Sequence, residues 1–262
     1  MSAVTSPEPM ASADDALASA ELSVLWREGD CLAIHKPAGW LVHRTGLDAG
    51  ETRFVVQTLR DQLGQHVFPV HRLDKGTSGV LLMALSSDAA RALSLQFEQR
   101  QVHKRYLAMV RGWPPEAISV DHPLRPDDAP PDIPPQDALT HLRRLATWQL
   151  DVPVDRYPHT RVALVEALPE TGRRHQIRRH LKHIAHPIIR DATHGKGAHN
   201  RWWAQFLGRQ RLWLHATELR LNHPADGREV VLRSDPLDAG LNPDWRALLS
   251  RPWCWTDAAG QG

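Results

Sequence analysis

Residues 71–79, HRLDKGTSG, place a single carboxylate among cations just before an apolar segment. Asp74 follows Arg72 by two positions and directly precedes Lys75, and the segment GVLLMAL that comes next is typical of a buried strand. Cations close to a carboxylate stabilise its ionised form, which can serve as a nucleophile. An aspartate shortly before a glycine is also a common solvated turn residue. The spacing alone leaves both interpretations open.

A second candidate is the basic segment TGRRHQIRRHLKH, residues 171–183, which contains no acidic residue. Ile177, Leu181 and Ile184 recur at helical spacing and predict the buried stripe of a helix. Arg178 lies on the border of this stripe, from which its guanidinium can reach inward to a bidentate pair with a buried carboxylate. The remaining cations can meet RNA phosphates or form an ordinary solvated face. They are Arg173, Arg174, Arg179 and Lys182.

Two further side chains have both a chemical and a structural interpretation. Tyr106 shares a predicted strand face with Val102 and Ala108. The structural interpretation is therefore a core tyrosine whose hydroxyl has a hydrogen-bond partner. His180 and His183 stand three residues apart on the predicted helix, but no carboxylate or cysteine accompanies them. We therefore expect no metal site at these histidines.

The elements that would position these residues are mainly strands, with helices interspersed but without regular alternation. Strands are expected at residues 22–26, 31–35, 79–85, 102–112, 139–150 and 161–168, and as a hairpin within 212–232 that turns at Asp226-Gly227. Helices are expected at about residues 88–99, in the basic segment, and at 244–249. The proline-rich residues 123–135 predict a surface loop. This pattern indicates a mixed α+β domain.

The bulk composition excludes several classes of protein. The chain has 262 residues, 42% of them hydrophobic, which is enough for one large domain or two modest ones. No apolar run approaches the roughly 20 residues of a membrane span, and the N-terminus lacks a secretory signal pattern. Residues 1–20 predict a disordered tail. With only two cysteines, Cys31 and Cys254, we expect no disulfide framework and a cytoplasmic protein.

Three segments, taken in order, resemble the signature motifs of the RluA-type pseudouridine synthases. They are HRLDKGTSG, KRYLAMVRG and LVEALPETGRRHQIRRHL. The resemblance extends from residue 22 to about residue 235 and includes an N-terminal KPxG-like element, KPAGW, at residues 36–40. Within the family, the chain is most similar to the tRNA pseudouridine-65 synthase branch. The segments behind that choice are GWLVHR, LRDQLGQHVFPVHRLD, QFEQRQVHKRY and RRHLKHIAHPII.

The resemblance implies a pseudouridine synthase fold, with a central mixed, mostly antiparallel sheet, flanking helices and a catalytic cleft. It implies one catalytic domain over residues 21–262, without an S4 domain, acting as a monomer and needing no cofactor or metal. The reaction would isomerise a flipped-out uridine of tRNA, in the acceptor–TΨC region at position 65. The alternatives are a synthase that acts on ribosomal RNA and a non-catalytic module that binds or folds RNA.

The resemblance also implies roles for individual residues. Asp74 would be the catalytic aspartate, and Arg178 the basic residue that pairs with it. Tyr106 would stack on the target uracil and assist proton transfer at C5. Arg72 would enter the space vacated by the base, and Ile177 would pack near the base. The full RNA-binding set expected is Arg72, Lys104, Arg173, Arg174, His175, Ile177, Arg179 and Lys182.

One position departs from the pattern of this branch. Arg190 stands in HPIIRD where the resemblance leads us to expect glycine. If that glycine has a left-handed conformation, an arginine in its place implies a reshaped loop. Lys75 and Gly76 occupy two positions that vary within the family.

Overall fold

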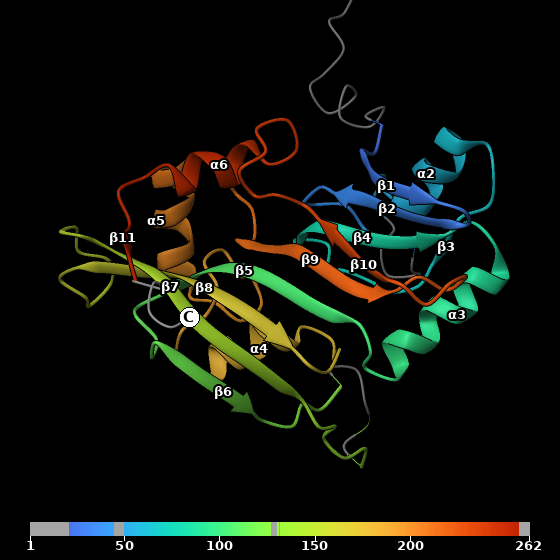
Figure 1. Ribbon diagram of the computed structural model, residues 1–262. Helices are drawn as coiled ribbons and strands as arrows, with labels where there is room; N and C mark the ends of the chain where they lie inside the picture. Colours follow the sequence, from blue (N-terminus) through green and yellow to red (C-terminus); the bar gives the residue numbers. More distant parts are fainter. Residues whose placement is uncertain (1–20, 45–49, 127–129, 131, 257–262) are drawn as a thin grey trace, which may run out of the picture.

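The computed structural model describes residues 21–44, 50–126, 130 and 132–256. The tail predicted at residues 1–20 lies outside them. Within the described residues, eleven strands form one sheet and five helices pack around it (Figure 1). The predicted α+β class with a mixed, mostly antiparallel sheet is therefore confirmed. In this part of the chain, no helix has both the length and the apolarity to cross a membrane.

The longest strands lie in the middle of the sheet and the shortest at its margins. The strands are β1 (Val24–Glu28), β2 (Cys31–Lys36), β3 (Phe68–Pro69), β4 (Ser78–Ala84), β5 (His103–Arg111), β6 (Ala117–Asp121), β7 (Leu139–Leu150), β8 (Thr160–Pro169), β9 (Leu214–Asn222), β10 (Glu229–Arg233) and β11 (Cys254–Trp255). The helices are α2 (Val55–Leu63), α3 (Ser87–Glu98), α4 (Gln176–His183), α5 (Gly197–Leu207) and α6 (Pro243–Leu249).

The sheet consists of two antiparallel halves joined by one short parallel pairing. The strand order is β1-β2-β4-β9-β5-β8-β7-β11, and only β4 and β9 run parallel among the described strands. Their contact is two residue pairs long, Ser78 with His215 and Gly79 with Ala216. A Cβ atom at residue 79 would lie 2.1 Å from the carbonyl oxygen of Ala216, and the φ of Gly79 is +121°. Only glycine fits this junction.

The protein has two hydrophobic cores, and β9 and β10 contribute to the core on the side of β2 and β4. One core gathers the buried strands β2 and β4 with α2 and α3, and includes Leu81 and Leu93. The other gathers β5, β7 and β8 with α4, α5 and α6, and includes Trp203 and Trp245. Figure 1 shows α2 and α3 beside β1–β4, and α5 and α6 beside the other half. Tyr106 packs against both cores, at the line where they meet.

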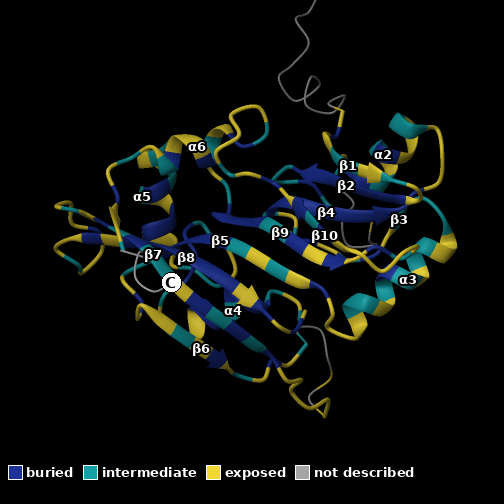
Figure 2. Ribbon diagram, viewed as in Figure 1, coloured by how far each residue is buried: buried dark blue, intermediate teal, exposed yellow. Residues whose placement is uncertain are grey.

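Burial follows the strand patterns that the sequence predicts. Every residue of β4 is buried, as expected for the apolar segment after HRLDKGTSG, and both β2 and β4 are dark blue in Figure 2. The helix expected at 88–99 occurs at Ser87–Glu98, where the Ser86 side chain accepts a hydrogen bond from the Ala89 N–H at 3.3 Å. The hairpin expected within residues 212–232 and the helix at the basic segment are confirmed, and the strands expected at 22–26 and 31–35 occur as the antiparallel pair β1 and β2. The helices α2 and α5 and the strands β3, β6 and β11 were not predicted.

Candidate functional site

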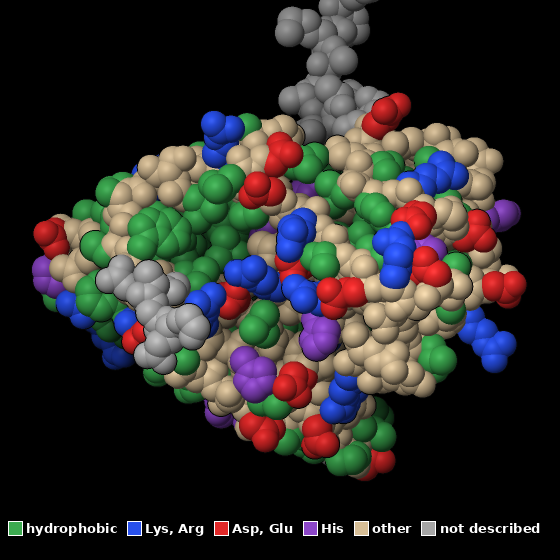
Figure 3. All heavy atoms as spheres, viewed as in Figure 1, with side chains coloured by type: hydrophobic (Ala, Val, Ile, Leu, Met, Phe, Trp, Pro, Cys, Tyr) green, Lys and Arg blue, Asp and Glu red, His purple; other side chains and the backbone are tan. Residues whose placement is uncertain are grey.

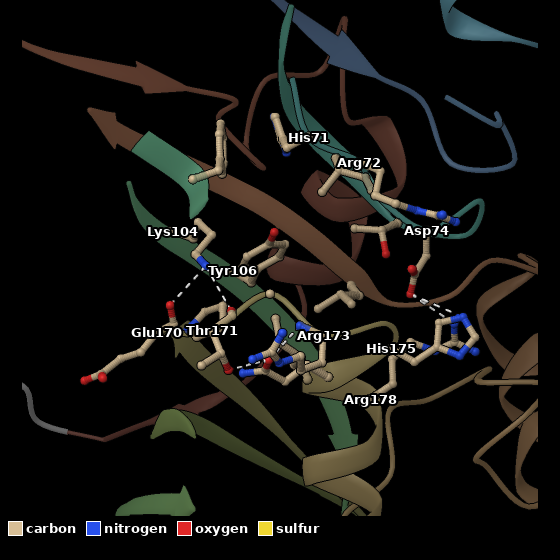
Figure 4. Close-up of a pocket in the computed structure, with 18 of the residues that line it drawn as sticks. His71, Arg72, Asp74, Lys104, Tyr106, Glu170, Thr171, Arg173, His175 and Arg178 are labelled. Carbon is tan, nitrogen blue, oxygen red and sulfur yellow. Dashed lines mark hydrogen bonds and ion pairs between the residues drawn. The ribbon is translucent and has the colours of Figure 1, made fainter. Parts of the chain in front are cut away.

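A cavity of about 430 Å³ lies where the two halves of the sheet meet. Asp74 enters it from the loop before β4, Tyr106 from β5, and Arg178 from the first turn of α4 (Figure 4). Three segments distant in sequence therefore converge on one space. The cavity also receives other residues singled out from the sequence, namely Arg72, Lys104, Arg173, His175 and Ile177.

Arg178 links Asp74 to a second carboxylate that the sequence analysis missed. Its Nη1 donates a hydrogen bond to Asp74 Oδ2 at 3.0 Å. Its Nε and Nη2 donate to the two oxygens of Asp191, each at 2.8 Å. The Arg178 and Asp191 side chains are 9% and 0% exposed, whereas that of Asp74 is 20% exposed. The bidentate pair with a buried carboxylate predicted for Arg178 thus exists, and its partner is Asp191.

The charges in this group stabilise one another. Burial disfavours both charged groups, yet the hydrogen bonds and attraction between them prevail. The pKa of Arg178 is raised by the carboxylates of Asp191 and Asp74 against the effect of its burial. The pKa of Asp191 is lowered by Arg178, again against the effect of burial. The cation beside Asp74 is therefore permanently charged.

The KPAGW element builds the loop that carries Asp74. The Lys36 side chain is fully buried, and its ammonium group donates to the backbone carbonyls of Lys75 at 3.2 Å and Thr77 at 2.7 Å. The Gly39 N–H donates to the Lys75 carbonyl at 2.8 Å, and the Thr77 N–H to the Asp74 carbonyl at 3.0 Å. Burial lowers the pKa of Lys36 to about 7, with Asp74 opposing this effect. The backbone on the C-terminal side of Asp74 is thus held by several hydrogen bonds.

Tyr106 occupies a widened position in the middle of the sheet. It pairs with Ala167 of β8 and Ala216 of β9, and the register with β9 shifts between Arg105 and Tyr106. The extra residue of this bulge is Thr217 in β9, and the two alanines opposite Tyr106 leave room for its ring. Burial raises the pKa of Tyr106, and the Asp74 carboxylate adds to this effect. Tyr106 is therefore a neutral, flat ring in the cavity wall.

The first turn of α4 is organised by buried hydrogen bonds. His175 precedes the helix with a φ of +56°, and its Nε2 lies 3.9 Å from Asp74 Oδ2. The Gln176 side chain accepts hydrogen bonds from the Thr171 hydroxyl at 2.6 Å and from the Arg173 N–H at 3.0 Å. It donates to the Leu139 carbonyl at 2.9 Å, which ties α4 to β7. This network holds Arg178 in place at the N-terminal end of α4.

The cations expected to meet RNA differ in their surroundings. Lys104 donates to the carbonyls of Glu170 and Thr171 inside the cavity, and burial lowers its pKa to about 8. Arg173 donates to the Asp137 carbonyl at 3.1 Å and Arg179 to the Arg125 carbonyl at 2.7 Å. Arg72, Arg174 and Lys182 are exposed.

Charge on the molecular surface is otherwise mixed. On the face shown in Figure 3, basic and acidic side chains alternate over the middle of the molecule. Among the described residues, no group of three or more His, Cys, Asp or Glu side chains is arranged to hold a metal ion. The ring of His180 is bonded on both sides, to the Thr140 hydroxyl and to the His122 carbonyl.

The arginine that departs from the expected pattern helps to support Asp191. Arg190 itself adopts the left-handed conformation, with a φ of +65°. Asn200, at the start of α5, accepts a hydrogen bond from the Arg190 N–H and donates one to the Asp191 carbonyl, both at 2.8 Å. The Asn200 side chain thereby holds the turn that presents Asp191 to Arg178 at two backbone groups, the N–H of Arg190 and the carbonyl of Asp191.

Comparisons with known proteins agree on one family. The family described as RNA pseudouridylate synthase matches residues 30–183. The chain is 48% identical over 237 residues to a tRNA pseudouridine synthase C of Yersinia pestis, covering 88% of this chain and 90% of that protein. It is 46% identical over 236 residues to a tRNA pseudouridine synthase C of Vibrio cholerae, covering 87% of this chain and 95% of that protein.

Two solved structures have the same fold. Human RNA Pseudouridylate Synthase Domain Containing 1 superimposes with a TM-score of 0.68 at 25% identity, covering 97% of this chain and 94% of that one. Human RNA Pseudouridylate Synthase Domain Containing 4 superimposes with a TM-score of 0.62 at 27% identity, covering 81% of this chain and 88% of that one.

Proposed function

Because this chain belongs to the RNA pseudouridylate synthase family, we propose that it converts a specific uridine of tRNA into pseudouridine, with Asp74 as the catalytic carboxylate. The observation that carries the proposal is the pairing of Asp74 with Arg178 at 3.0 Å, inside a cavity also walled by Tyr106. The similarity to proteins named tRNA pseudouridine synthase C supports tRNA as the substrate.

The reaction breaks the N1–C1′ bond of the uridine, turns the base and forms a C5–C1′ bond, while the proton on C5 moves to N1. Asp74 acts as an ionised carboxylate, either as a nucleophile or as a base toward the sugar, and Arg178 maintains its charge in both roles. The Tyr106 ring supports the face of the detached uracil, and Ile177 packs against its other side. The Tyr106 hydroxyl can also relay the proton that leaves C5, passing on its own proton as it accepts that one, so that the side chain stays neutral.

The target base must leave its stack to reach Asp74. Unstacking costs a few kcal/mol, and contacts with phosphates and the base have to offset it. Arg72 enters the gap in the RNA, while Arg173, Arg174, Arg179 and Lys182 hold the backbone beside the cavity. We place the target in the acceptor–TΨC region, at position 65, where a folded arm can be recognised by shape and phosphate contacts.

The experiment that tests this function maps pseudouridine after incubating purified protein separately with tRNA transcripts and ribosomal RNA fragments. We expect one product site in folded tRNA, no product with the Asp74→Asn protein, and normal product with Glu98→Gln. Glu98 is an exposed carboxylate that lines the same cavity, so its variant is the matched control. Modification of ribosomal RNA with tRNA untouched would overturn the choice of substrate. Binding of RNA without any product would favour a non-catalytic module.

A further inference from the structure

A second cavity, of about 480 Å³, lies at the other end of β5 and α4. Five residues along β5 separate Tyr106 in the first cavity from Arg111 in the second, which is about 17 Å of strand. Nine residues separate Ile177 in the first cavity from His186 in the second, about 13 Å if all were helical. Because Tyr106 and Arg111 are an odd number of residues apart, their side chains point to opposite faces of β5. One bound RNA can therefore reach both cavities by passing around the end of this strand.

Aromatic rings and guanidinium groups form much of the wall of this second cavity. The Arg161 guanidinium lies 4.5 Å from the centre of the Trp113 ring, and that of Arg111 lies 5.9 Å from the centre of the Tyr157 ring. Trp113 is 39% exposed, so its ring is accessible from solvent. Flat rings next to cations are the combination that binds bases by stacking and phosphates by charge.

The cavity also contains buried polar atoms that lack a partner within the described part of the chain. His199 is 4% exposed, and neither of its ring nitrogens has a hydrogen-bond partner there. The same holds for Nη1 of Arg111. Burial and the nearby Arg111 lower the pKa of His199, so its ring is neutral and offers one donor and one acceptor. Buried polar groups are normally satisfied, so a pair of unsatisfied ones in a cavity wall points to a polar ligand.

The residues that line this cavity include no acidic side chain that would repel an anionic ligand. His159, which lines the cavity, pairs with Asp151, whose side chain is 81% exposed. Asp155 is likewise exposed and Arg156 beside it carries the opposite charge. The wall itself contributes the cations Arg111 and Arg161.

We propose that this second cavity binds one nucleotide of the RNA substrate, away from the uridine that is modified. The base stacks on the rings of Trp113 and Tyr157, its polar edge meets the imidazole of His199, and its phosphate is bound by Arg111 and Arg161. This subsite rests on the proposed function, because the RNA that fills it is the substrate. It would contribute affinity for a folded RNA without touching the reacting atoms.

Kinetics with folded tRNA test the subsite. Trp113→Ala should raise KM at least about fivefold, the lower end expected for losing one stacked base, while kcat stays unchanged. Trp113→Phe keeps a stacking ring and should restore KM. Arg161→Gln should raise KM and reduce the salt dependence of binding by about one phosphate contact. The matched control is Trp255→Ala, which removes an exposed tryptophan from β11.

A second variant distinguishes whether the higher KM of Trp113→Ala comes from the lost stacking on the base or from a change in the fold. Trp113 Nε1 donates to the Val162 carbonyl at 3.1 Å, and phenylalanine loses this bond while keeping the ring. An equal increase of KM in Trp113→Ala and Trp113→Phe would therefore mark a structural effect and overturn the inference. So would an unchanged KM in Trp113→Ala. We do not substitute His199 in this test, because a change there could disturb the neighbouring Asn200, which supports Asp191.

A measurement that does not depend on turnover separates this inference from the proposed function. Ultraviolet cross-linking of bound tRNA, followed by mapping of the attached peptides, should identify the segments around Trp113 or Tyr157. Cross-links there in a protein that forms no pseudouridine would support the subsite while the proposed function fails. Pseudouridine formation with cross-links confined to the first cavity would overturn the subsite alone.

Discussion

Arg178 is held by Asp191 through two parallel hydrogen bonds of 2.8 Å. The pair is buried, and it fixes the plane of the guanidinium so that the third nitrogen reaches Asp74 at 3.0 Å. A planar cation held on two sides loses little freedom when it makes its third contact. Asp191 therefore acts on Asp74 through Arg178, as a positioning residue.

Asp191→Asn should reduce both activity and stability. An amide keeps the shape but removes the charge and replaces one acceptor by a donor, which leaves the buried cation poorly compensated. We expect kcat to fall at least about tenfold with a small change in KM, and the free energy of unfolding to fall by about 3 kcal/mol. Single-turnover assays and urea titration measure the two effects. The control is Asp61→Asn, whose exposed pair with Arg60 should contribute less than about 1 kcal/mol. Equal losses in both variants would contradict the role of Asp191.

Adjacent arginines on α4 should differ in what they contribute. Arg178→Met removes the partner of Asp74 and leaves two carboxylates without their cation, so catalysis should fall far more than RNA affinity. Arg179→Ala and Lys182→Ala should mainly weaken RNA binding and reduce its salt dependence by about one contact each. Filter binding at several salt concentrations, combined with product assays, separates these outcomes. Identical behaviour of the Arg178 and Arg179 variants would show that the helix faces are misassigned.

Stability should fall in acid because His215 is buried in its neutral form. Its Nε2 donates to the Ser234 carbonyl at 3.0 Å and its Nδ1 accepts from the Ser78 hydroxyl at 2.8 Å. Burial, aided by His35 and Arg211, lowers its pKa to about 3, although the bond to Ser234 opposes this. The unfolded histidine, with a pKa of about 6.5, binds more protons throughout the interval between the two values.

The contribution of His215 to stability is thus complete above pH 6.5 and is lost as the pH falls from there toward 3. The expected slope is up to about 1.4 kcal/mol per pH unit. Urea unfolding at pH 7 and pH 5 should show a smaller loss in His215→Gln than in the wild type. The exposed His66 serves as the control, and His66→Gln should keep the slope of the wild type. An unchanged slope in His215→Gln would refute this assignment.

Replacing Arg190 by glycine should stabilise the protein. The left-handed backbone of Arg190 costs about 1–2 kcal/mol for a residue with a Cβ atom, and glycine is free of this strain but gains entropy when unfolded. We expect a net increase of at most about 1 kcal/mol in the free energy of unfolding, by urea titration. Arg190→Ala removes the same side chain but keeps the Cβ atom, so it should not stabilise. A loss of stability in Arg190→Gly would instead show that the contact of its side chain with Asn200 dominates.

The family resemblance singled out three residues in separate continuous motifs, and the structure brings all three into one cavity. Asp74, Tyr106 and Arg178 each belong to a segment with a recognisable flanking pattern, and the helix expected at about residues 88–99 occurs at Ser87–Glu98. Asp191 was missed because its importance comes from a contact with α4 and not from its neighbours.

The unpredicted helices lack the usual start signals. The residue before α2, Phe54, and the residue before α5, Lys196, provide no side-chain cap, and α2 begins with two β-branched valines. Tertiary packing stabilises these helices: Leu59 of α2 is fully buried in one core and Trp203 of α5 in the other.

Asp74 and Arg178 are 104 residues apart in the chain and are attached to different halves of the sheet. A contact of such long range forms late in folding, because the closure of a long loop precedes any stabilisation that it brings. Both hydrophobic cores could form before this contact does, and the protein would still have no activity. A fragment that ends before α4 would contain Asp74 and Tyr106 but neither Arg178 nor Asp191. During refolding, the return of activity should therefore follow the docking of the two halves and lag behind the recovery of secondary structure.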